Sequence, residues 1–224
     1  MIDPSARIHA TADLEEAVSI GPGTSIGPGA RIRTGARIGA GCEIGPGVFL
    51  DEGVTVGEQV RIEQGALLYR GSTVEDGVLI GPAVILAEDR YPRVVTTTAD
   101  LRAEGDPEIE PIVLRSACSV GAGAIVLAGV EVGTFAPVGA GAVVTRSVAG
   151  HGLVVGSPAH RIGWVCACGV RLQGAAGQPA GATPALYAQD RDLHCLTCVR
   201  RYRYVADVDT LVELPASLPQ GAPA

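Results

Sequence analysis

The sequence contains no lysine, so all 17 of its basic residues are arginine. Any phosphate group that this chain binds must therefore be held by arginine, by histidine or by backbone N–H groups. Acidic residues outnumber the basic ones at 24 to 17, which gives a formal net charge of −7. A negative chain argues against nucleic acid as a partner, because nucleic-acid binding depends on neutralising phosphates with basic side chains.

Long apolar runs are also missing. No stretch approaches the roughly 20 apolar residues that span a bilayer, and the start of the chain lacks the basic region and apolar run of a signal peptide. We therefore expect a cytoplasmic protein without a membrane partner. Aromatic residues make up only 4% of the chain, so the core must be aliphatic, and 31 glycines indicate many turns.

What the sequence does contain is a strict six-residue repeat. Every sixth residue from Ile2 to Leu86 is isoleucine, leucine or valine, and the repeat returns from Leu114 to Val144. Four positions later the side chain is small or β-branched, as at Ala30. A period of six fits neither a helix nor a simple strand, whereas it fits a parallel β-helix in which each hexad forms one face and one turn. With three faces per coil, the hexads predict an all-β solenoid of about seven coils.

The repeat is interrupted once. The interval from Leu86 to Leu114 is not a multiple of six, so residues from about 87 to 111 are predicted to leave the solenoid as one extruded loop. This loop begins with Glu88-Asp89-Arg90-Tyr91-Pro92-Arg93. Function concentrates on long loops carried by rigid scaffolds, although an idle surface insertion is the alternative.

Beyond the solenoid the chemistry of the chain changes. Cys166-Ala167-Cys168-Gly169 and Cys195-Leu196-Thr197-Cys198 form two close cysteine pairs, and a stretch rich in Gly and Ala lies between them. Two such pairs predict a structural zinc site with four thiolate ligands. Redox or disulfide chemistry, which is less common in cytosolic chains, and the absence of any metal are the alternatives. Two other cysteines occupy the small inward positions of their hexads and are expected in the core: Cys42 and Cys118.

Together these motifs resemble the hexapeptide acyltransferases, whose fold is a left-handed β-helix. Residues 152–164 are similar to the segment that closes the helix in that family, Val-Val-Gly-Asn-Pro-Ala and a basic residue. Here Ser157 stands in place of Asn, and His160 stands in place of the first basic residue. The two cysteine pairs resemble the zinc ribbon of one branch, the N-acetyltransferases that act on the 3-amino group of nucleotide-linked sugars. Their loop contains Asn-Asp-x-x-Pro-Arg; here Asp89, Pro92 and Arg93 match, and Glu88 stands in place of Asn.

The resemblance implies a homotrimer that transfers an acetyl group from acetyl-CoA to an amino group of a nucleotide-linked amino sugar, by direct attack in a ternary complex. It also implies that acetyl-CoA lies along the later coils, between neighbouring subunits. The residues that would contact it there are Gly121, Ala122, Gly139 and Ala140, with His160 and Arg161 toward the adenosine phosphate.

Acyl transfer from a thioester requires a deprotonated amine and a stabilised oxyanion. The four histidines are His9, His151, His160 and His194, and none lies in the loop or in a central coil. A histidine base is therefore not expected. The resemblance instead leaves Asp89 or Glu88 to accept the proton or to orient the amine, and Arg90, Tyr91 and Arg93 to contact the substrate. Simple solvation of an acidic pair is the alternative.

Two rival functions were weighed against acyl transfer. A γ-type carbonic anhydrase shares the β-helix but needs three histidine ligands, which this chain does not offer between His9 and His151. A non-catalytic scaffold that uses its zinc ribbon for docking stays open.

The expected organisation is a left-handed β-helix domain at 1–163, a zinc-ribbon-like module at 164–206 and a disordered tail at 207–224.

Overall fold

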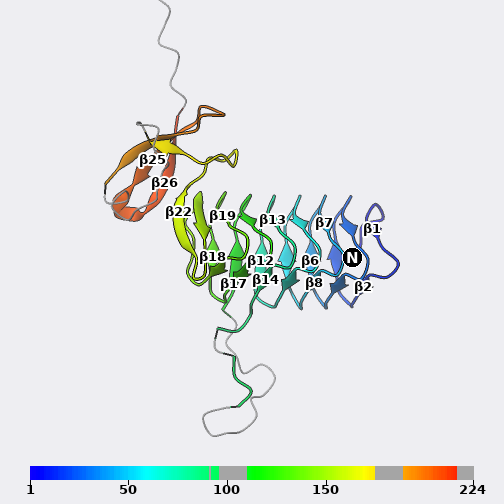
Figure 1. Ribbon diagram of the computed structural model, residues 1–224. Coiled ribbons are helices and arrows are strands. Elements are labelled where there is room, and N and C mark those ends of the chain that lie inside the picture. Colours follow the sequence, from blue (N-terminus) through cyan, green and yellow to red (C-terminus); the bar gives the residue numbers. More distant parts are fainter. Residues whose placement is uncertain (91, 96–109, 175–188, 216–224) are drawn as a thin grey trace, which may run out of the picture.

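The computed structural model describes residues 1–90, 92–95, 110–174 and 189–215. They form a long β-solenoid with a small β-sheet module beside its C-terminal end (Figure 1). Most strands of the solenoid are two residues long, and tight turns join them. Among the described residues, no helix is long and apolar enough to cross a bilayer.

Three sheets form the faces of the solenoid. The first sheet comprises β1 (Arg7–Ile8), β4 (Ser25–Ile26), β7 (Glu43–Ile44), β10 (Arg61–Ile62), β13 (Leu79–Ile80), β16 (Ser119–Val120), β19 (Pro137–Val138), β21 (Gly152–Val155) and β22 (His160–Trp164). The second sheet comprises β2 (Asp13–Leu14), β5 (Arg31–Ile32), β8 (Phe49–Leu50), β11 (Leu67–Leu68), β14 (Ile85–Leu86), β17 (Ile125–Val126) and β20 (Val143–Val144). The third sheet comprises β3 (Ser19–Ile20), β6 (Arg37–Ile38), β9 (Thr55–Val56), β12 (Ser72–Val74), β15 (Ile112–Leu114) and β18 (Glu131–Val132).

The pairing register confirms the hexad prediction. Ile26 pairs in parallel with Ile44, and Ile44 with Ile62, so equivalent hexads stack one coil apart. The second residue of these strands points inward and is buried, and the small residue that precedes each strand, such as Ala30, is buried beside it. The second sheet has seven strands, one per coil. The predicted all-β parallel solenoid of about seven coils is therefore confirmed.

The extruded loop joins the second sheet to the third. β14 ends at Leu86 and β15 begins at Ile112, and these two strands belong to neighbouring faces of the prism. Residues 96–109 lie outside the described residues. The described parts of the loop project from one side of the solenoid near β14 and β17 (Figure 1).

The C-terminal module is an antiparallel sheet with its own core. It comprises β23 (Gln173–Gly174), β24 (Arg191–His194), β25 (Arg201–Val205) and β26 (Thr210–Leu214), and the short 3-10 helix η2 (Ala206–Val208) links the last two strands. The core of the module contains Trp164, Leu172, Tyr202 and Tyr204. Three of these residues are aromatic, whereas the buried core of the solenoid is aliphatic.

The predicted start of a disordered tail at 207 is wrong. β26 pairs with β25 along its whole length, and Leu211 is buried. The sequence Thr-Leu-Val-Glu-Leu gives only a weak strand signal by itself, because its stability comes from pairing with β25 rather than from local preference. Residues 216–224 lie outside the described residues.

Candidate functional site

The extruded loop leaves the solenoid at the corner that follows β14, and its first residues carry the predicted catalytic side chains. Glu88 and Asp89 are partly exposed, and Arg90 is exposed. Tyr91 lies outside the described residues. The base of the loop thus presents two adjacent carboxylates at the edge of a rigid face.

Two ion pairs fix the base of the loop. Nε of Arg70 donates to Oε2 of Glu88 at 3.3 Å, and this contact raises the pKa of Arg70. Nη1 of Arg90 donates to Oε2 of Glu110 at 3.2 Å, which joins the two ends of the loop. Since all four side chains are partly exposed, each pair contributes little to stability. Their effect is to hold Glu88 and Arg90 in defined positions.

The sequence did not point to Arg70 or Glu110 as partners. The first could have been found, because Arg70 precedes Glu88 by one coil, and the same one-coil spacing joins Glu43 to Arg61. Glu110 could not, because the loop removes any fixed spacing. Arg93, predicted to bind substrate, is exposed, and its Nη1 donates to the carbonyl of Pro92 at 3.0 Å.

The predicted acetyl-CoA residues lie at a different corner. Gly121 and Gly139 directly follow β16 and β19 of the first sheet, and Ala122 and Ala140 are exposed in the adjoining turns. A Cβ at Gly121 would lie 2.5 Å from the backbone N of Ala140 in the next coil. At Gly121 the stacking of the coils therefore leaves no room for a side chain, whether or not a ligand lies beside it. Contact with acetyl-CoA stays a prediction.

We call the loop residues and the predicted acetyl-CoA residues the two half-sites, and in a single chain these half-sites lie apart. The loop leaves the corner after the second sheet, and Gly121 and Gly139 lie at the corner after the first sheet. The second sheet spans the face between these two corners. Among the described residues, the two sets therefore lie at different corners of the solenoid.

Arg161 has another partner than the predicted phosphate. Its Nη1 and Nη2 donate to the two carboxylate oxygens of Asp209 at 2.9 and 2.8 Å, and its guanidinium lies 4.3 Å from the ring centre of Trp164. Bidentate Arg–carboxylate pairs of this kind are geometrically specific. We therefore leave Arg161 out of the proposed acetyl-CoA site. His160 is exposed at the start of β22, and its role stays a prediction.

The four cysteines of the C-terminal module converge. Their Sγ atoms all lie within 4.8 Å of one another, with 3.3 Å between Cys166 and Cys198 and 3.5 Å between Cys168 and Cys195. All six cysteines of the chain are free. A zinc–thiolate tetrahedron with bonds of about 2.3 Å places its sulfurs about 3.8 Å apart, whereas a disulfide needs about 2.05 Å. The donor set therefore fits a tetrahedral metal ion.

Each cysteine pair sits in a turn that a backbone hydrogen bond closes, and the second turn is one residue longer than the first. The N–H of Cys166 donates to the carbonyl of Val170, and the N–H of Cys195 donates to that of Arg200. In each turn the residue after the second cysteine has a positive φ, 86° at Gly169 and 55° at Val199. A β-branched residue in this region is uncommon and marks a constrained backbone. The two turns bring backbone N–H groups toward the sulfurs.

The thiol of Cys166 is set up for ionisation. Burial acts to raise its pKa, but hydrogen bonds from the N–H of Cys168, from the hydroxyl of Tyr202 and from neighbouring thiols lower the pKa to about 6. The two remaining cysteines behave differently: Cys42 and Cys118 are buried among aliphatic side chains, and burial raises the pKa of Cys118 to about 12. They belong to the core, as predicted.

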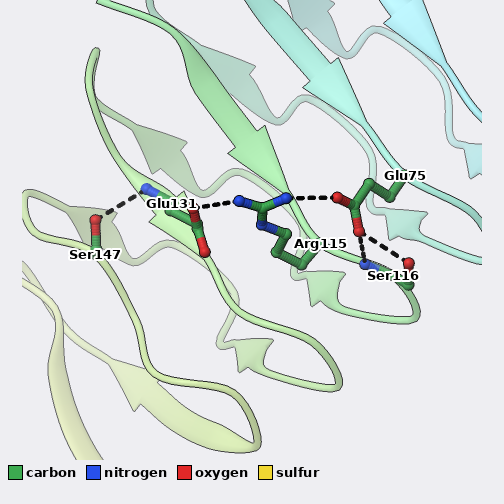
Figure 2. A network of polar contacts seen from close by, with 5 residues as sticks. All are labelled: Glu75, Arg115, Ser116, Glu131 and Ser147. Carbon is green, nitrogen blue, oxygen red and sulfur yellow. Dashed lines mark hydrogen bonds and ion pairs between the residues drawn. The ribbon is translucent and has the colours of Figure 1, made fainter.

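A charged network on the third sheet was not anticipated from the sequence. Arg115 donates to Oε1 of Glu75 and to Oε2 of Glu131, both at 2.8 Å, and the N–H and hydroxyl of Ser116 donate to Oε2 of Glu75 at 2.9 Å (Figure 2). The hydroxyl of Ser147 accepts the N–H of Glu131 at 3.0 Å. The network ties together the coils before and after the extruded loop.

One signal could have revealed this network. At the corner after the third sheet the residue following each strand is glycine at 21, 39, 57 and 133, but it is Glu75 after β12 and Arg115 after β15. A Cβ at Gly39 would lie 2.4 Å from the carbonyl oxygen of Gly57 in the next coil. Two opposite charges that replace glycine at one corner, on both sides of the loop, mark a local change in the stack.

Comparison with known proteins shows the repeat and the fold. Residues 17–52 match the family of bacterial transferase hexapeptide (six repeats). A galactoside acetyltransferase in complex with coenzyme A superposes with a TM-score of 0.51 at 23% identity, which covers 58% of this chain and 64% of that chain. The predicted hexapeptide-repeat solenoid is thereby confirmed.

Two further proteins are similar over part of their length. The dTDP-3-amino-3,6-dideoxy-alpha-D-galactopyranose 3-N-acetyltransferase of Aneurinibacillus thermoaerophilus is 39% identical over 61 residues, which are 27% of this chain. The matched part spans 32% of that curated relative. A hexapeptide-repeat acetyltransferase of Vibrio cholerae complexed with acetyl coenzyme A superposes with a TM-score of 0.45 at 22% identity, over 64% of this chain and 72% of that one.

Proposed function

We propose that this hexapeptide-repeat chain is an acyl-CoA-dependent N-acyltransferase that acetylates an amino group of a nucleotide-linked amino sugar. The observation that carries the proposal is the single extruded loop that interrupts the solenoid. In this loop Asp89, Pro92 and Arg93 have the spacing found in the sugar N-acetyltransferases. The similarity to the 3-N-acetyltransferase of Aneurinibacillus thermoaerophilus supports the same substrate class. A non-catalytic scaffold is the rival.

In the proposed reaction the sugar amine attacks the thioester carbonyl carbon of acetyl-CoA directly. The C–S bond breaks, the CoA thiolate leaves, and the amine gives up one proton. We assign the base to Asp89, because it is the carboxylate that matches the resembled Asn-Asp-x-x-Pro-Arg pattern. Glu88 stands in place of the Asn of that pattern and is held by Arg70, so we assign it a substrate-positioning role.

We also propose that the active protein is a homotrimer whose subunits contact one another along the second sheet. The outward residues of this sheet in its later coils are apolar and partly exposed: Phe49, Leu67, Ile85, Ile125 and Val143. At the equivalent positions of the first and third sheets, polar and charged residues predominate. An apolar face that continues over several coils is typical of an interaction surface.

This trimer accounts for the separation of the two half-sites. The second sheet is bordered by the corner that carries the loop and by the corner that carries Gly121 and Gly139. A threefold axis parallel to the solenoid and facing this sheet brings the first corner of one subunit against the second corner of its neighbour. Each of the three sites would then take its loop from one subunit and its acetyl-CoA corner from another.

The trimer contact is testable by light scattering. Leu67→Glu places a charge on the second sheet and should convert trimers to folded monomers that no longer turn over. Leu79→Glu is the matched control, because Leu79 is equally outward but lies on the first sheet and is 44% exposed. A trimeric Leu67→Glu protein would move the interface to another face.

For the C-terminal module we propose a structural zinc ion bound by Cys166, Cys168, Cys195 and Cys198. Four protein thiolates complete the coordination of zinc, so the ion would hold the fold of the module and would not bind substrate. The convergence of the four sulfurs supports this role.

Calorimetry distinguishes the enzyme from the scaffold. Acetyl-CoA should bind the native protein, and addition of the dTDP-linked 3-amino sugar should then release free CoA thiol at a rate proportional to enzyme. A protein that binds neither compound would be a scaffold. If acetyl-CoA binds but no nucleotide-linked amino sugar causes release of CoA thiol, the proposed co-substrate would stand and the proposed class of acceptor would be wrong.

A further inference from the structure

We propose that the four-cysteine module is a metal-dependent end cap of the solenoid, and that His151 and Tyr202 connect the metal site to the last coils. This inference does not depend on the acyltransferase reaction. It concerns what the metal site does for the rest of the chain, and it rests on two rows of contacts that join the module to the solenoid.

The last coil of a solenoid needs a cover. An uncovered end leaves unpaired backbone groups and exposes inward apolar side chains. Here β21 pairs with β19, β22 folds back on β21, and Ala149 packs against the core of the C-terminal module. Val148 and Val154, the last inward residues, are buried. The module is therefore part of the cover and not a free appendage.

His151 lies at the centre of the junction. Its ring centre is 5.1 Å from that of Phe135 in the preceding coil and 5.4 Å from that of Tyr202 in the module. Its carbonyl accepts the N–H of Val165 at 2.8 Å, and its Nδ1 lies 3.0 Å from the carbonyl oxygen of Val165. Because a carbonyl can only accept, Nδ1 must carry the hydrogen. This paired contact fixes the residue that directly precedes Cys166.

Tyr202 continues the row to the metal site. It is fully buried in β25, and its hydroxyl lies 3.2 Å from Sγ of Cys166. The same hydroxyl accepts the N–H of Ala167 at 3.2 Å, so its own hydrogen is directed to the sulfur. Such partners orient metal ligands and strengthen metal binding. The row Phe135–His151–Tyr202–Cys166 thus runs from the solenoid to a ligand.

A second row joins the module to the solenoid without touching a cysteine. Asp209 binds Arg161, whose guanidinium covers the ring of Trp164, and the ring centre of Trp164 is 5.4 Å from that of Tyr204. The hydroxyl of Tyr204 donates to Oδ1 of Asp209 at 2.8 Å. Loss of the metal should therefore loosen the row through His151 while this second row keeps the module attached.

Amide hydrogen exchange, read by mass spectrometry, tests the proposal on the full-length protein. Zinc is first measured by elemental analysis, and exchange is then compared between the zinc-loaded protein and the same protein after chelation. Removal of zinc should speed exchange in peptides covering 134–151 as well as in the module, and should leave peptides covering 20–62 unchanged. Unchanged exchange at 134–151, or a protein that binds no zinc, would overturn the proposal.

His151→Asn tests the connection itself. Asparagine tolerates the positive φ of 64° at this position but removes the ring. In this variant, chelation should still loosen the module and should no longer reach 134–151. Phe135→Leu removes the aromatic ring that packs on His151 and should have the same effect. This second variant keeps the test valid if the His151→Asn protein does not fold. His9→Asn, an exposed histidine in the first coil, is the matched control and should behave like the parent.

Tyr202→Phe separates orientation of the ligand from packing of the ring. The stack on His151 is kept, and only the hydrogen bond to Cys166 is lost. We expect zinc affinity to fall by about 10–100-fold, with a shifted thiolate-to-metal absorption band in the cobalt-loaded protein. Parental affinity and an unshifted band would show that the hydroxyl does not act on the metal site.

Discussion

The two ends of the solenoid are built from the same hexads but differ in how well their core is covered. At the N-terminal end the inward residues Ile2 and Ile8 are 45% and 37% exposed, because the first coil packs against a neighbour on one side only. At the C-terminal end Val144 and Val154 are buried, and there β22 folds back on β21, the strand that carries Val154. The hexad therefore determines which residues point inward, and the cover determines whether they are buried.

The two ends also differ in the side chains that make their contacts. In the first coil, polar side chains accept backbone donors of the second coil: Ser5 accepts the N–H of Gly23 at 3.0 Å, and Thr11 accepts that of Gly29 at 3.1 Å. At the other end aromatic rings pack against one another, namely those of His151, Trp164, Tyr202 and Tyr204. A solenoid can thus end in short polar contacts or in a packed cap, and this chain has one of each.

The largest expected effect is loss of folding, and it should occur on substitution in an interior coil but not at the open N-terminal end. Ile38→Asp should prevent folding, because Ile38 is 4% exposed and an unpaired carboxylate in an aliphatic stack costs several kcal/mol, comparable with total stability. Ile8→Asp, the same change at the open end, should give a soluble protein with a slightly lower melting temperature. Circular dichroism melts would check both. A normally melting Ile38→Asp protein would contradict the register.

Deletion of residues 90–108 should abolish transfer and leave both ends of the solenoid intact. The flanking strands pack through Leu86 and Leu114, which the deletion spares. Hydrogen exchange should show parental protection in the first and last coils, while release of CoA thiol falls to background. Turnover by the shortened protein would place the active site elsewhere.

Replacement of a single proposed zinc ligand should affect only the C-terminal end of the solenoid, which the module covers. Cys166→Ser should release about one zinc ion per chain, since structural zinc sites bind with about 10–16 kcal/mol of apparent free energy and lose much of it without one thiolate. Elemental analysis would count the metal. Cys42→Ser is the control, because this core cysteine lies outside the module and should change no metal content.

The smallest effect concerns the network between the two ends. Arg115 donates to Glu75 and Glu131 and thereby lowers the pKa of both carboxyls. A carboxyl with a lowered pKa stabilises the fold above its ordinary pKa of about 4.3, and this contribution is lost as the pH falls through the lowered value. Arg115→Gln should return both pKa values toward the ordinary one, as read by NMR titration. Unshifted titrations would show that the network is not formed in solution.

The sequence was most informative where spacing is fixed. The period of six identified the inward residues, and the two cysteine pairs identified four side chains whose sulfurs converge. Both patterns depend on short separations along the chain. The pairing of Glu75 with Arg115 was missed because these residues are 40 apart with the loop between them. Arg161 was expected near a phosphate, yet it binds Asp209, which is 48 residues away in the turn between η2 and β26.

The period of six does not indicate how the two sets of proposed site residues come together. The loop and the corner with Gly121 and Gly139 follow different sheets, and in our proposal the trimer brings them together. The left hand of the helix likewise comes from family resemblance, since a repeat of six residues fits either hand.

The most direct measurement of the proposed activity is the kcat/KM of Asp89→Asn for acetyl transfer to a dTDP-linked 3-amino sugar. If Asp89 handles the amine proton, the value should fall by roughly 10²-fold or more, because general bases contribute about 10²–10⁴-fold. Acetyl-CoA binding by calorimetry should barely change, since the substitution keeps the shape and removes only the charge. Parental turnover by Asp89→Asn would contradict the assignment, and the proton would then leave through water or the CoA sulfur.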